Sequence, residues 1–437
     1  MNDRLSARPT HRALLGTALG HALEWYDWGI YAIFVPFFST RFFDPHDEVS
    51  AVLSSLAVFA VGFAARPVGG LVVGRLADRV GRKPMMLATV AGMAAGSLII
   101  GLCPTYATLG AGASAILVLA RIVQGLATGG ELPSAQTYLA EYAPRRRRGL
   151  WSSVIYIASV GGNTVGVLLG LLLSMLLSKS DMASFGWRVP FIVGGVLGAG
   201  TLWIRRSLAE TAAFTAERKE RPRLWQEVLR HRRQAVQVVG MSVGLTVVYY
   251  AWVIAAPAYA ISAMHVNADS AMLAGVLSSL LLIAVLPAWG ALSDRVGRRP
   301  VLLISTLGTA VSLFPLQAMI DGSAWRLGVA MAIAMVFIGA GVSILPAAYA
   351  EMFPTHIRTV GLAVPYSIAV AAFGGTAPYL QTWMGETAGR AAFTGYVVLL
   401  LVVSAMTVLT LPETRGMSLT TTGNDSDDTE GIEREAA

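Results

Sequence analysis

The chain has 437 residues, of which 55% are apolar and only 14% are charged, whereas a soluble protein carries about 25% charged residues. This composition excludes an ordinary soluble globular protein. The single cysteine, Cys103, excludes an internal disulfide and a multi-cysteine metal site. The formal charge of +7 is spread over short connections between apolar runs. It does not form the continuous basic face that binding of nucleic acid requires.

Twelve apolar runs are long enough to cross a bilayer as helices, since about 20 apolar residues span the hydrocarbon. In chain order they are 13–38, 50–74, 84–103, 112–142, 150–176, 188–205, 235–262, 271–292, 300–320, 326–350, 359–384 and 391–411. An even number of spans predicts both termini on one side. Most of the 33 Lys and Arg residues fall in the termini and the even-numbered connections, so this side is predicted to be the cytoplasm. We expect a multi-pass protein of the cell (inner or plasma) membrane.

The predicted fold class is an all-α membrane protein, which its longest connection divides into two parts. Residues 1–12 are predicted to form a cytoplasmic N-terminus, and 13–205 a bundle of six helices. The connection 206–234 is rich in Arg and Glu and is predicted to be a cytoplasmic linker with short amphipathic helices at the lipid surface. A second six-helix bundle is expected over 235–411. Residues 412–437 are acidic and polar and are predicted to be a disordered cytoplasmic tail.

Two charged motifs occur once in each half of the chain. Asp-Arg-Val-Gly-Arg-Lys-Pro at 78–84 returns as Asp-Arg-Val-Gly-Arg-Arg-Pro at 294–300. A Glu followed seven positions later by an Arg also occurs twice, as Glu141 with Arg148 and as Glu351 with Arg358. Two motifs repeated in the same order indicate two related halves, as in transporters built from structural repeats.

Ionisable side chains inside the apolar runs are candidates for function, because each costs at least about 2.5 kcal/mol at mid-membrane. Five lie well inside the runs of the first half: Glu24, Asp27, Arg66, Arg121 and Glu131. Helical spacing predicts two polar stripes, which are His21, Glu24, Asp27 and Tyr31 near one face of the first helix, and Arg121, Gln124, Thr128 and Glu131 on the fourth. Because lipid cannot satisfy such groups, we expect the stripes to face a water-filled cavity or each other.

The chemistry of these side chains suggests a division of roles. Arg66 is the first choice for a substrate carboxylate, because a guanidinium matches a carboxylate with two parallel hydrogen bonds. Asp27 and Glu131 are the expected proton carriers beside Arg121, since burial favours the protonated form of an acid and a nearby cation opposes this. Glu24 is the second choice. For any one of these residues the alternative is a structural ion pair.

Further substrate contacts are expected from polar and aromatic residues. The full set of expected contacts is Arg66, Arg121, Gln124, Tyr31, Tyr249 and Tyr366. The second half is expected to supply a cavity wall that recognises the shape of the substrate. Its expected residues are Tyr249, Tyr250, Trp252, Tyr366 and Gln381. Aromatic residues in membrane helices also serve as packing or interface anchors, which is the alternative. The role of His21 has three alternatives, which are a packed histidine, a hydrogen-bond partner of Glu24 and a substrate contact.

The repeated motifs predict a latch between the halves at the cytoplasmic side. A carboxylate there can cap the N-terminus of a neighbouring helix and pair with arginine. The expected members are Asp78, Arg79, Arg82, Asp294, Arg295 and Arg298, with Glu141 paired to Arg148 and Glu351 paired to Arg358. Such pairs would hold the outward-open state and break during transport. The alternative is that these arginines only set the orientation.

These motifs resemble those of the major facilitator superfamily over nearly the whole chain. Its loop motif is similar to 74–83 and 290–299, its fourth-helix motif to 121–125, and the ending of its sugar-porter branch to 411–416. The closest resemblance is to the metabolite:proton symporter subfamily, on residues 23–27, 65–70, 129–131 and 186–191. His21 stands where that subfamily is expected to have asparagine.

The resemblance implies a fold of two pseudo-symmetric six-helix bundles and secondary active transport by alternating access. It implies uptake, by proton symport, of a small metabolite that carries a carboxylate. The implied substrates are a dicarboxylate such as α-ketoglutarate, a shikimate-like acid, or a zwitterion such as proline or betaine. The expected partners are then this substrate, protons and the lipid bilayer, without nucleic acid, and the expected state is a monomer.

Two other classes of function are alternatives. A proton-antiport exporter of drugs or metabolites would carry a Gly-Pro motif in its fifth helix, where this chain reads Gly-Gly-Asn-Thr-Val-Gly at 161–166. A membrane enzyme or receptor is disfavoured by the lack of a Walker loop and of a His-Glu-x-x-His motif. We therefore predict gradient-driven transport without enzymatic activity, cofactor or metal site.

Overall fold

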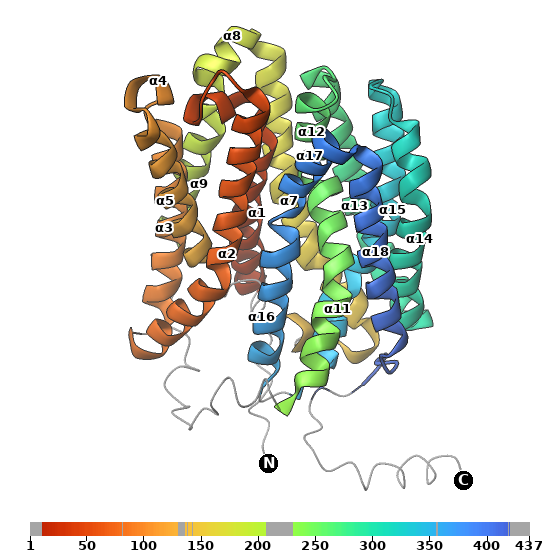
Figure 1. Cartoon of the computed structure of the whole chain (residues 1–437). Coiled ribbons are helices and arrows are strands. Elements are labelled where there is room, and N and C mark those ends of the chain that lie inside the picture. Colours follow the sequence, from red (N-terminus) through yellow and green to blue (C-terminus); the bar gives the residue numbers. More distant parts are fainter. Residues whose placement is uncertain are drawn as a thin grey trace, which may run out of the picture.

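The computed structural model describes residues 11–80, 82–129, 136–137, 139–141, 143–206, 230–354, 357–417 and 419. Within these ranges the ordered elements are helices, and no strand occurs. Long helices lie side by side and run from one end of the molecule to the other (Figure 1). The prediction of an all-α membrane protein is confirmed for this part of the chain.

Each half of the chain supplies a series of long helices joined by short ones. The first half has α1 (His11–Phe42), α2 (Glu48–Val80), α3 (Arg82–Leu102), α4 (Tyr106–Leu109), α5 (Ala111–Thr128), the 3₁₀ turn η1 (Arg145–Arg147), α7 (Arg148–Leu176), α8 (Lys179–Asp181), the π-helical η2 (Met182–Gly186) and α9 (Arg188–Arg206). The second half has α11 (Arg232–Val248), the π-helical η4 (Tyr249–Ile254), α12 (Ala256–Ser262), α13 (Ala268–Val296), α14 (Arg298–Met319), α15 (Ala324–Glu351), α16 (Arg358–Ala369), the π-helical η5 (Val370–Gly374), α17 (Ala377–Ala388) and α18 (Arg390–Leu409).

Nine of the described helices are long and apolar enough to cross a membrane, and a pair bent by 40°, Lys179–Gly186 with Arg188–Trp203, adds a tenth. The two remaining predicted spans, 13–38 and 359–384, fall on α1 and on the run of α16, η5 and α17. Each predicted span therefore overlaps a helix or an interrupted helix in the described part of the chain.

The predicted domain limits are not decided by this arrangement. The bundles at 13–205 and 235–411 stay predictions. Residues 1–10, and 207–229 of the predicted linker, lie outside the described residues.

The two halves meet along α7 and α13, which pack against each other. A Cβ on Gly290 would stand 2.6 Å from the Gly149 carbonyl oxygen, and a Cβ on Gly149 would stand 2.6 Å from the Gly290 carbonyl oxygen. Small residues allow helix backbones to approach this closely. One end of the molecule contains the start of α7 and the end of α13. We call it the latch end. It is the predicted cytoplasmic end.

Replacing Gly290 by valine is expected to force α7 and α13 apart at the latch end, because the atoms facing it are backbone and cannot move aside. Overpacking of this kind costs about 1–3 kcal/mol. The separation can be measured as faster alkylation of a cysteine placed at Ser152, which is 2% exposed, in a background that lacks Cys103. Gly161→Val is the matched control, since a Cβ there meets no described atom within 4 Å. Equal labelling rates in the two variants would contradict the prediction.

Candidate functional site

A buried ion pair joins α1 to α2 in the first half. Nη2 of Arg66 lies 3.1 Å from Oε1 of Glu24, and the two residues are 7% and 3% exposed. The guanidinium carbon of Arg66 lies 4.2 Å from the ring centre of Phe63 and 4.4 Å from that of Trp28, which adds cation–π attraction. Nε of Arg66 and Oε2 of Glu24 have no hydrogen-bond partner among the described residues. Arg66, which is predicted to bind a substrate carboxylate, is thus held by the acid Glu24. Both side chains retain hydrogen-bonding capacity.

Asp27 belongs to a separate polar group formed by α1, α3 and α5. Its Oδ1 accepts a hydrogen bond from Ser97, and its Oδ2 accepts one from Nε2 of Gln124 at 2.7 Å. Gln124 in turn accepts a hydrogen bond from Nη1 of Arg121 at 2.8 Å. The guanidinium carbon of Arg121 lies 3.8 Å from the ring centre of Tyr31. Gln124 therefore bridges the predicted proton carrier and the cation beside it.

The single polar face expected on the first helix is divided in the structure. His21 and Glu24 face α7 and α2, whereas Asp27 faces α3 and α5. Three residues along a helix fall about 60° short of a full turn, so His21 and Asp27 point about 120° apart. The expectation of one shared face was wrong for Asp27.

The ionisable side chains of this centre are closed off from solvent. Glu24, Asp27, Arg66 and Arg121 are all buried. Between the halves, the rings of Trp25, Tyr249 and Tyr250 contact one another, with centres 5.5 to 6.0 Å apart. We expected the two polar stripes to face a water-filled cavity or each other. In this structure they face each other, because Gln124 donates to Asp27 and Arg121 lies over the ring of Tyr31.

Three tyrosines expected around the substrate have different surroundings. The Tyr31 hydroxyl donates a hydrogen bond to the Ser55 carbonyl oxygen at 2.9 Å. The Tyr249 hydroxyl has no partner among the described residues. Tyr366 packs against Tyr349, with ring centres 5.7 Å apart. Of the three, only the Tyr249 hydroxyl is buried and still available for a hydrogen bond.

Other predicted residues lie away from this centre or outside the described side chains. Trp252 and Gln381 line a separate small cavity of about 60 Å³ in the second half. Glu131 lies outside the described residues. The side chains of three predicted latch residues lie outside the described part as well: Asp78, Arg79 and Arg82.

One segment has the Gly-x-Ser-x-Gly spacing of a hydrolase nucleophile, at 240–244. That chemistry requires a sharp turn from a strand into a helix. Here the segment lies inside α11. Ser242 donates a hydrogen bond to the Val238 carbonyl oxygen at 2.6 Å, and its hydroxyl lies 2.6 Å from that of Tyr349. The serine therefore serves helix packing.

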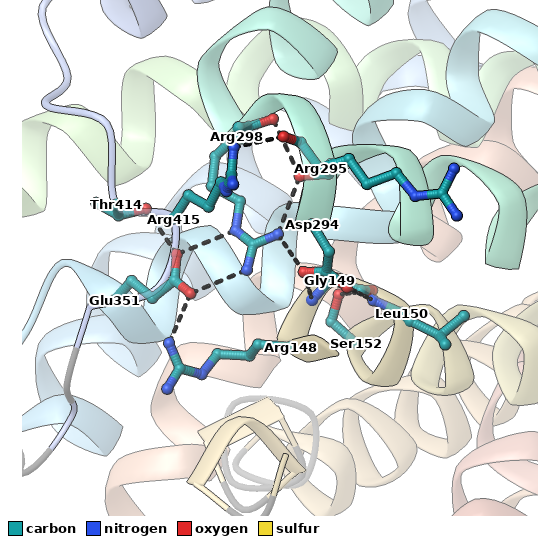
Figure 2. Close-up of polar contacts among 12 residues, drawn as sticks. Arg148, Gly149, Leu150, Ser152, Asp294, Arg295, Arg298, Glu351, Thr414 and Arg415 are labelled. Atoms are coloured by element: carbon teal, nitrogen blue, oxygen red, sulfur yellow. Dashed lines mark hydrogen bonds and ion pairs between the residues drawn. The ribbon is translucent and has the colours of Figure 1, made fainter. Parts of the chain in front are cut away.

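Asp294, near the end of α13, caps the start of α7 across the contact between the halves (Figure 2). Its Oδ1 accepts a hydrogen bond from the Gly149 N–H at 2.8 Å, and its Oδ2 accepts one from the Leu150 N–H at 2.9 Å. The first N–H groups of a helix have no partner within it and lie at the positive end of its dipole. Nη1 of Arg298 lies 2.8 Å from the same carboxylate. The contacts are those expected of a latch carboxylate, and the role in transport stays a prediction.

Glu351 lies between arginines of both halves, and its side chain is fully buried (Figure 2). Its Oε1 lies 2.7 Å from Nη1 of Arg148 on α7 and 3.2 Å from Nη2 of Arg298. Its Oε2 accepts hydrogen bonds from Nε of Arg298 at 3.2 Å and from the Thr414 hydroxyl at 2.6 Å. One buried carboxylate thus binds donors from both halves of the chain.

The two Glu–Arg motifs exchange partners between the halves. We expected Glu141 to pair with Arg148, and Glu351 with Arg358. Instead Arg148 pairs with Glu351, and Nη1 of Arg358 lies 2.7 Å from Oε1 of Glu141. The expected pairing within each half was wrong, and both ion pairs connect the first half to the second.

The exchange follows from the way each arginine is anchored to the helix before it. Nε of Arg148 donates to the Ala140 carbonyl oxygen at 3.3 Å, and Nε of Arg358 donates to the Ala350 carbonyl oxygen at 2.8 Å. The last carbonyl groups of a helix lack a partner within it. Because Nε is engaged at its own helix end, the Nη groups extend to the opposite half.

The segment that follows α18 also packs at the latch end. The Glu413 carboxylate accepts hydrogen bonds from the N–H groups of Arg298 and Arg299 at 2.8 and 3.2 Å, which caps the start of α14. The side chain of Arg295, an expected latch residue, points away from this network in Figure 2. Only its carbonyl oxygen takes part, by accepting a hydrogen bond from Arg415.

Backbone carbonyl groups of the same segment reach the first half. The Gly416 carbonyl oxygen accepts a hydrogen bond from Arg145 at 3.2 Å, and that of Met417 accepts one from Arg148 at 3.3 Å. The predicted disorder of 412–437 was therefore wrong for 412–417, because these contacts hold the segment in place. Residues 420–437 lie outside the described residues. The signal in the sequence was the Pro-Glu-Thr motif.

Two family models match this chain. The model of the Major Facilitator Superfamily matches residues 17–285, and that of the Sugar (and other) transporter family matches residues 202–425.

Two curated relatives are similar over most of their length. The chain is 33% identical over 419 residues to the alpha-ketoglutarate permease of Escherichia coli (strain K12), covering 94% of this chain and 96% of the relative. It is 31% identical over 427 residues to the proline/betaine transporter of Salmonella typhimurium, covering 93% of this chain and 84% of the relative. Among solved structures, the crystal structure of D-xylose-proton symporter superposes with a TM-score of 0.70 at 21% identity, covering 93% of this chain and 98% of that one. The last likeness concerns the fold alone.

The exchange of partners can be tested with two double-mutant cycles. Removing one partner of a buried ion pair costs about 3–5 kcal/mol, and residues in contact have non-additive effects. In thermal unfolding, we expect the effects of Arg148→Gln and Glu351→Gln on the free energy of unfolding to depart from additivity by at least about 1 kcal/mol. The effects of Arg148→Gln and Glu141→Gln should be additive within about 0.5 kcal/mol. Stronger coupling of Arg148 to Glu141 than to Glu351 would disprove the pairing between halves.

Proposed function

The chain belongs to the major facilitator superfamily, and on that premise we propose that it is a proton-coupled symporter that takes up a small carboxylate-bearing metabolite by alternating access. Its family and its relatives are transporters, so it is a membrane transporter and not an enzyme. We further propose that it works as a monomer in the cell (inner) membrane, with the latch end and both termini in the cytoplasm.

The observation that carries this proposal is the ion pair between Arg66 and Glu24. Glu24 and a substrate carboxylate compete for the charge of Arg66, because two ionised carboxylates beside one guanidinium repel each other. A proton on Glu24 removes its charge and frees the guanidinium. Proton and carboxylate then favour each other's binding, and this coupling is reciprocal. Two ligands that bind together are carried together, which is symport.

The contacts favour Glu24 over Asp27 as the first proton carrier. Both oxygens of Asp27 already accept hydrogen bonds, from Ser97 and Gln124, whereas Oε2 of Glu24 has no partner among the described residues. We propose that Asp27 acts as a second carrier, with Arg121 and Gln124 setting its charge. Glu131 is proposed on sequence grounds alone.

The remaining proposed contacts shape the substrate pocket. Tyr249 is proposed to donate its unpartnered hydroxyl to the substrate. Tyr366 is proposed to border the pocket from the second half. Tyr31 is proposed to hold Arg121 in position by packing its ring against the guanidinium. The closed latch supports a cycle in which the pairs of Glu351 and Glu141 break when the halves open toward the cytoplasm.

The proposed substrate is a dicarboxylate such as α-ketoglutarate or a shikimate-like acid, which is supported by similarity to the alpha-ketoglutarate permease. A zwitterion of the proline or betaine type is the second candidate, and similarity to the proline/betaine transporter supports it. The observation that favours a zwitterion is the balance of charge, since Glu24 and Asp27 already offset Arg66 and Arg121. A dianion would bring two negative charges into this buried centre, which requires protons to accompany it.

The function can be tested by uptake of radiolabelled α-ketoglutarate, shikimate, proline and glycine betaine into proteoliposomes. We expect an inward proton gradient to stimulate uptake of at least one compound. Arg66→Lys should reduce its apparent affinity tenfold or more, because lysine keeps the charge and loses the planar fork. Arg326→Lys, at an exposed ion pair, is the matched control. Uptake that is indifferent to the gradient for all four compounds would count against the proposal.

Glu24→Gln is expected to imitate the protonated acid. The variant should keep exchange of substrate across the membrane, because Arg66 is then free, and it should lose stimulation by a proton gradient. The measurement compares counterflow with gradient-driven uptake of the same compound. Asp27→Asn provides the comparison within the same helix. If Asp27→Asn uncouples transport and Glu24→Gln does not, Asp27 is the first carrier.

A further inference from the structure

His21 is buried between α1 and α7, with a different neighbour at each ring nitrogen. Nε2 accepts a hydrogen bond from Nε1 of Trp25 at 3.1 Å and lies 2.8 Å from the hydroxyl oxygen of Ser159. Nδ1 lies 3.6 Å from Oε2 of Glu24. Neither Nδ1 nor this Oε2 has a hydrogen-bond partner among the described residues.

The neighbours of His21 decide where its proton lies. The indole N–H of Trp25 is a donor only, so Nε2 has to present its lone pair. The neutral ring therefore carries its proton on Nδ1, on the side of Glu24. The Ser159 hydroxyl can donate to Nε2 in this state.

A further proton has no favourable place while Trp25 keeps this hydrogen bond. On Nε2 of His21 it would face the indole N–H. On Oε2 of Glu24 it would face the N–H at Nδ1. Two donors that face each other in a buried site repel each other and remain desolvated. The observed geometry thus holds the pair of His21 and Glu24 without the extra proton.

A second arrangement of the same side chains accepts the proton. Ser159 lies 2.9 Å from the Ile155 carbonyl oxygen and can donate to it. Its oxygen can then accept from a protonated Nε2. Only the indole N–H has to leave. The imidazolium formed in this way would attract Glu24 and weaken its bond to Arg66, which lies 3.1 Å away on the other oxygen.

The position of Trp25 depends on the second half of the chain. Its ring centre lies 5.5 Å from that of Tyr249 and 6.0 Å from that of Tyr250, both on η4. A movement of η4 relative to α1 therefore changes the packing that holds the indole N–H on His21.

We propose that His21 and Glu24 form one proton-binding pair whose charge is controlled by the indole N–H of Trp25. When η4 moves away from α1, the indole leaves, His21 takes up a proton through Nε2, and Glu24 turns from Arg66 to His21. The inference rests on the proposed function, in which Arg66 binds the substrate carboxylate. It places the proton on His21 in place of Glu24, and it adds Trp25 as the residue that links proton binding to movement of the halves.

Asp27 on α1 interacts electrostatically with Glu24, but both of its oxygens already accept hydrogen bonds, from Ser97 and Gln124. The other charged or titratable groups near the pair are not bases that compete for the proton. Arg66 on α2 is the only other ionised side chain in contact with it among the described residues. The tyrosines around it are Tyr156 on α7, Tyr249 and Tyr250 on η4, and Tyr366 on α16. A tyrosine hydroxyl is neutral at physiological pH.

The proposal can be tested without substrate by ¹⁵N nuclear magnetic resonance of the imidazole nitrogens in the full chain in nanodiscs. The chain has six histidines, and His21→Asn identifies the signal of His21. At neutral pH we expect a neutral ring with its proton on Nδ1. Trp25→Phe keeps the ring and removes the donor. It should raise the pH at which His21 is half protonated by about one unit, a tenfold change in proton affinity.

Two further variants make the test specific. Ser159→Ala removes the acceptor for the protonated ring and should lower the same pH, which is opposite in sign to Trp25→Phe. Trp187→Phe is the matched control, because Trp187 is also buried and its indole N–H has no partner among the described residues. It should leave the titration of His21 unchanged. A proton on Nε2 in the unaltered protein, or equal titration in Trp25→Phe and Trp187→Phe, overturns the proposal.

A transport measurement separates this inference from the function on which it rests. For whichever of α-ketoglutarate, shikimate, proline and glycine betaine the unaltered protein takes up, His21→Asn should retain counterflow and lose stimulation by the proton gradient at least tenfold. Full stimulation in His21→Asn overturns the role of His21 and leaves the symporter intact. Lack of gradient stimulation in the unaltered protein contradicts the proposed function, whatever the titration shows.

Discussion

A charged side chain that leaves water needs a partner inside the protein, because an unmatched charge in a buried site is far more costly than a missing apolar contact. In this chain the partner at the latch end often belongs to the other half. Asp294 of the second half binds the start of α7, and Glu351 binds Arg148. Each half therefore presents an arginine whose ion pair crosses to the other half, Arg148 in the first and Arg358 in the second. In the proposed cycle, water can replace these polar contacts as the halves open.

The membrane helices could be predicted from sequence, since each span has to be long and apolar by itself. The repeated motifs also pointed to the residues of the latch. Their pairing could not be predicted, because seven residues of spacing suggest a local pair. The actual choice depends on the carbonyl groups of Ala140 and Ala350. Every residue has a backbone carbonyl group, and the amino-acid sequence does not mark the two that anchor Arg148 and Arg358.

The same limit applies to the centre of the first half. Glu24, Asp27, Arg66 and Arg121 stand out in sequence because charge is rare in apolar runs. Ser97 and Gln124 bind Asp27 on one side of α1, and Ser159 contacts His21, the neighbour of Glu24, on the other. Serine is common in membrane helices and forms no motif here. Which acid faces which cation follows from the rotation of α1, and a difference of three residues is enough to change it.

The π-helical turn at Tyr249–Ile254 has a consequence for how the second half can change. A π-turn contains one residue more than an α-turn, and here it brings two consecutive aromatic rings onto the same indole. If the turn rewound as an α-helix, the surplus residue would have to be absorbed beyond it, and the side chains that follow would rotate by about 100°. The surplus residue of this segment therefore sets the direction in which the side chains that follow it point.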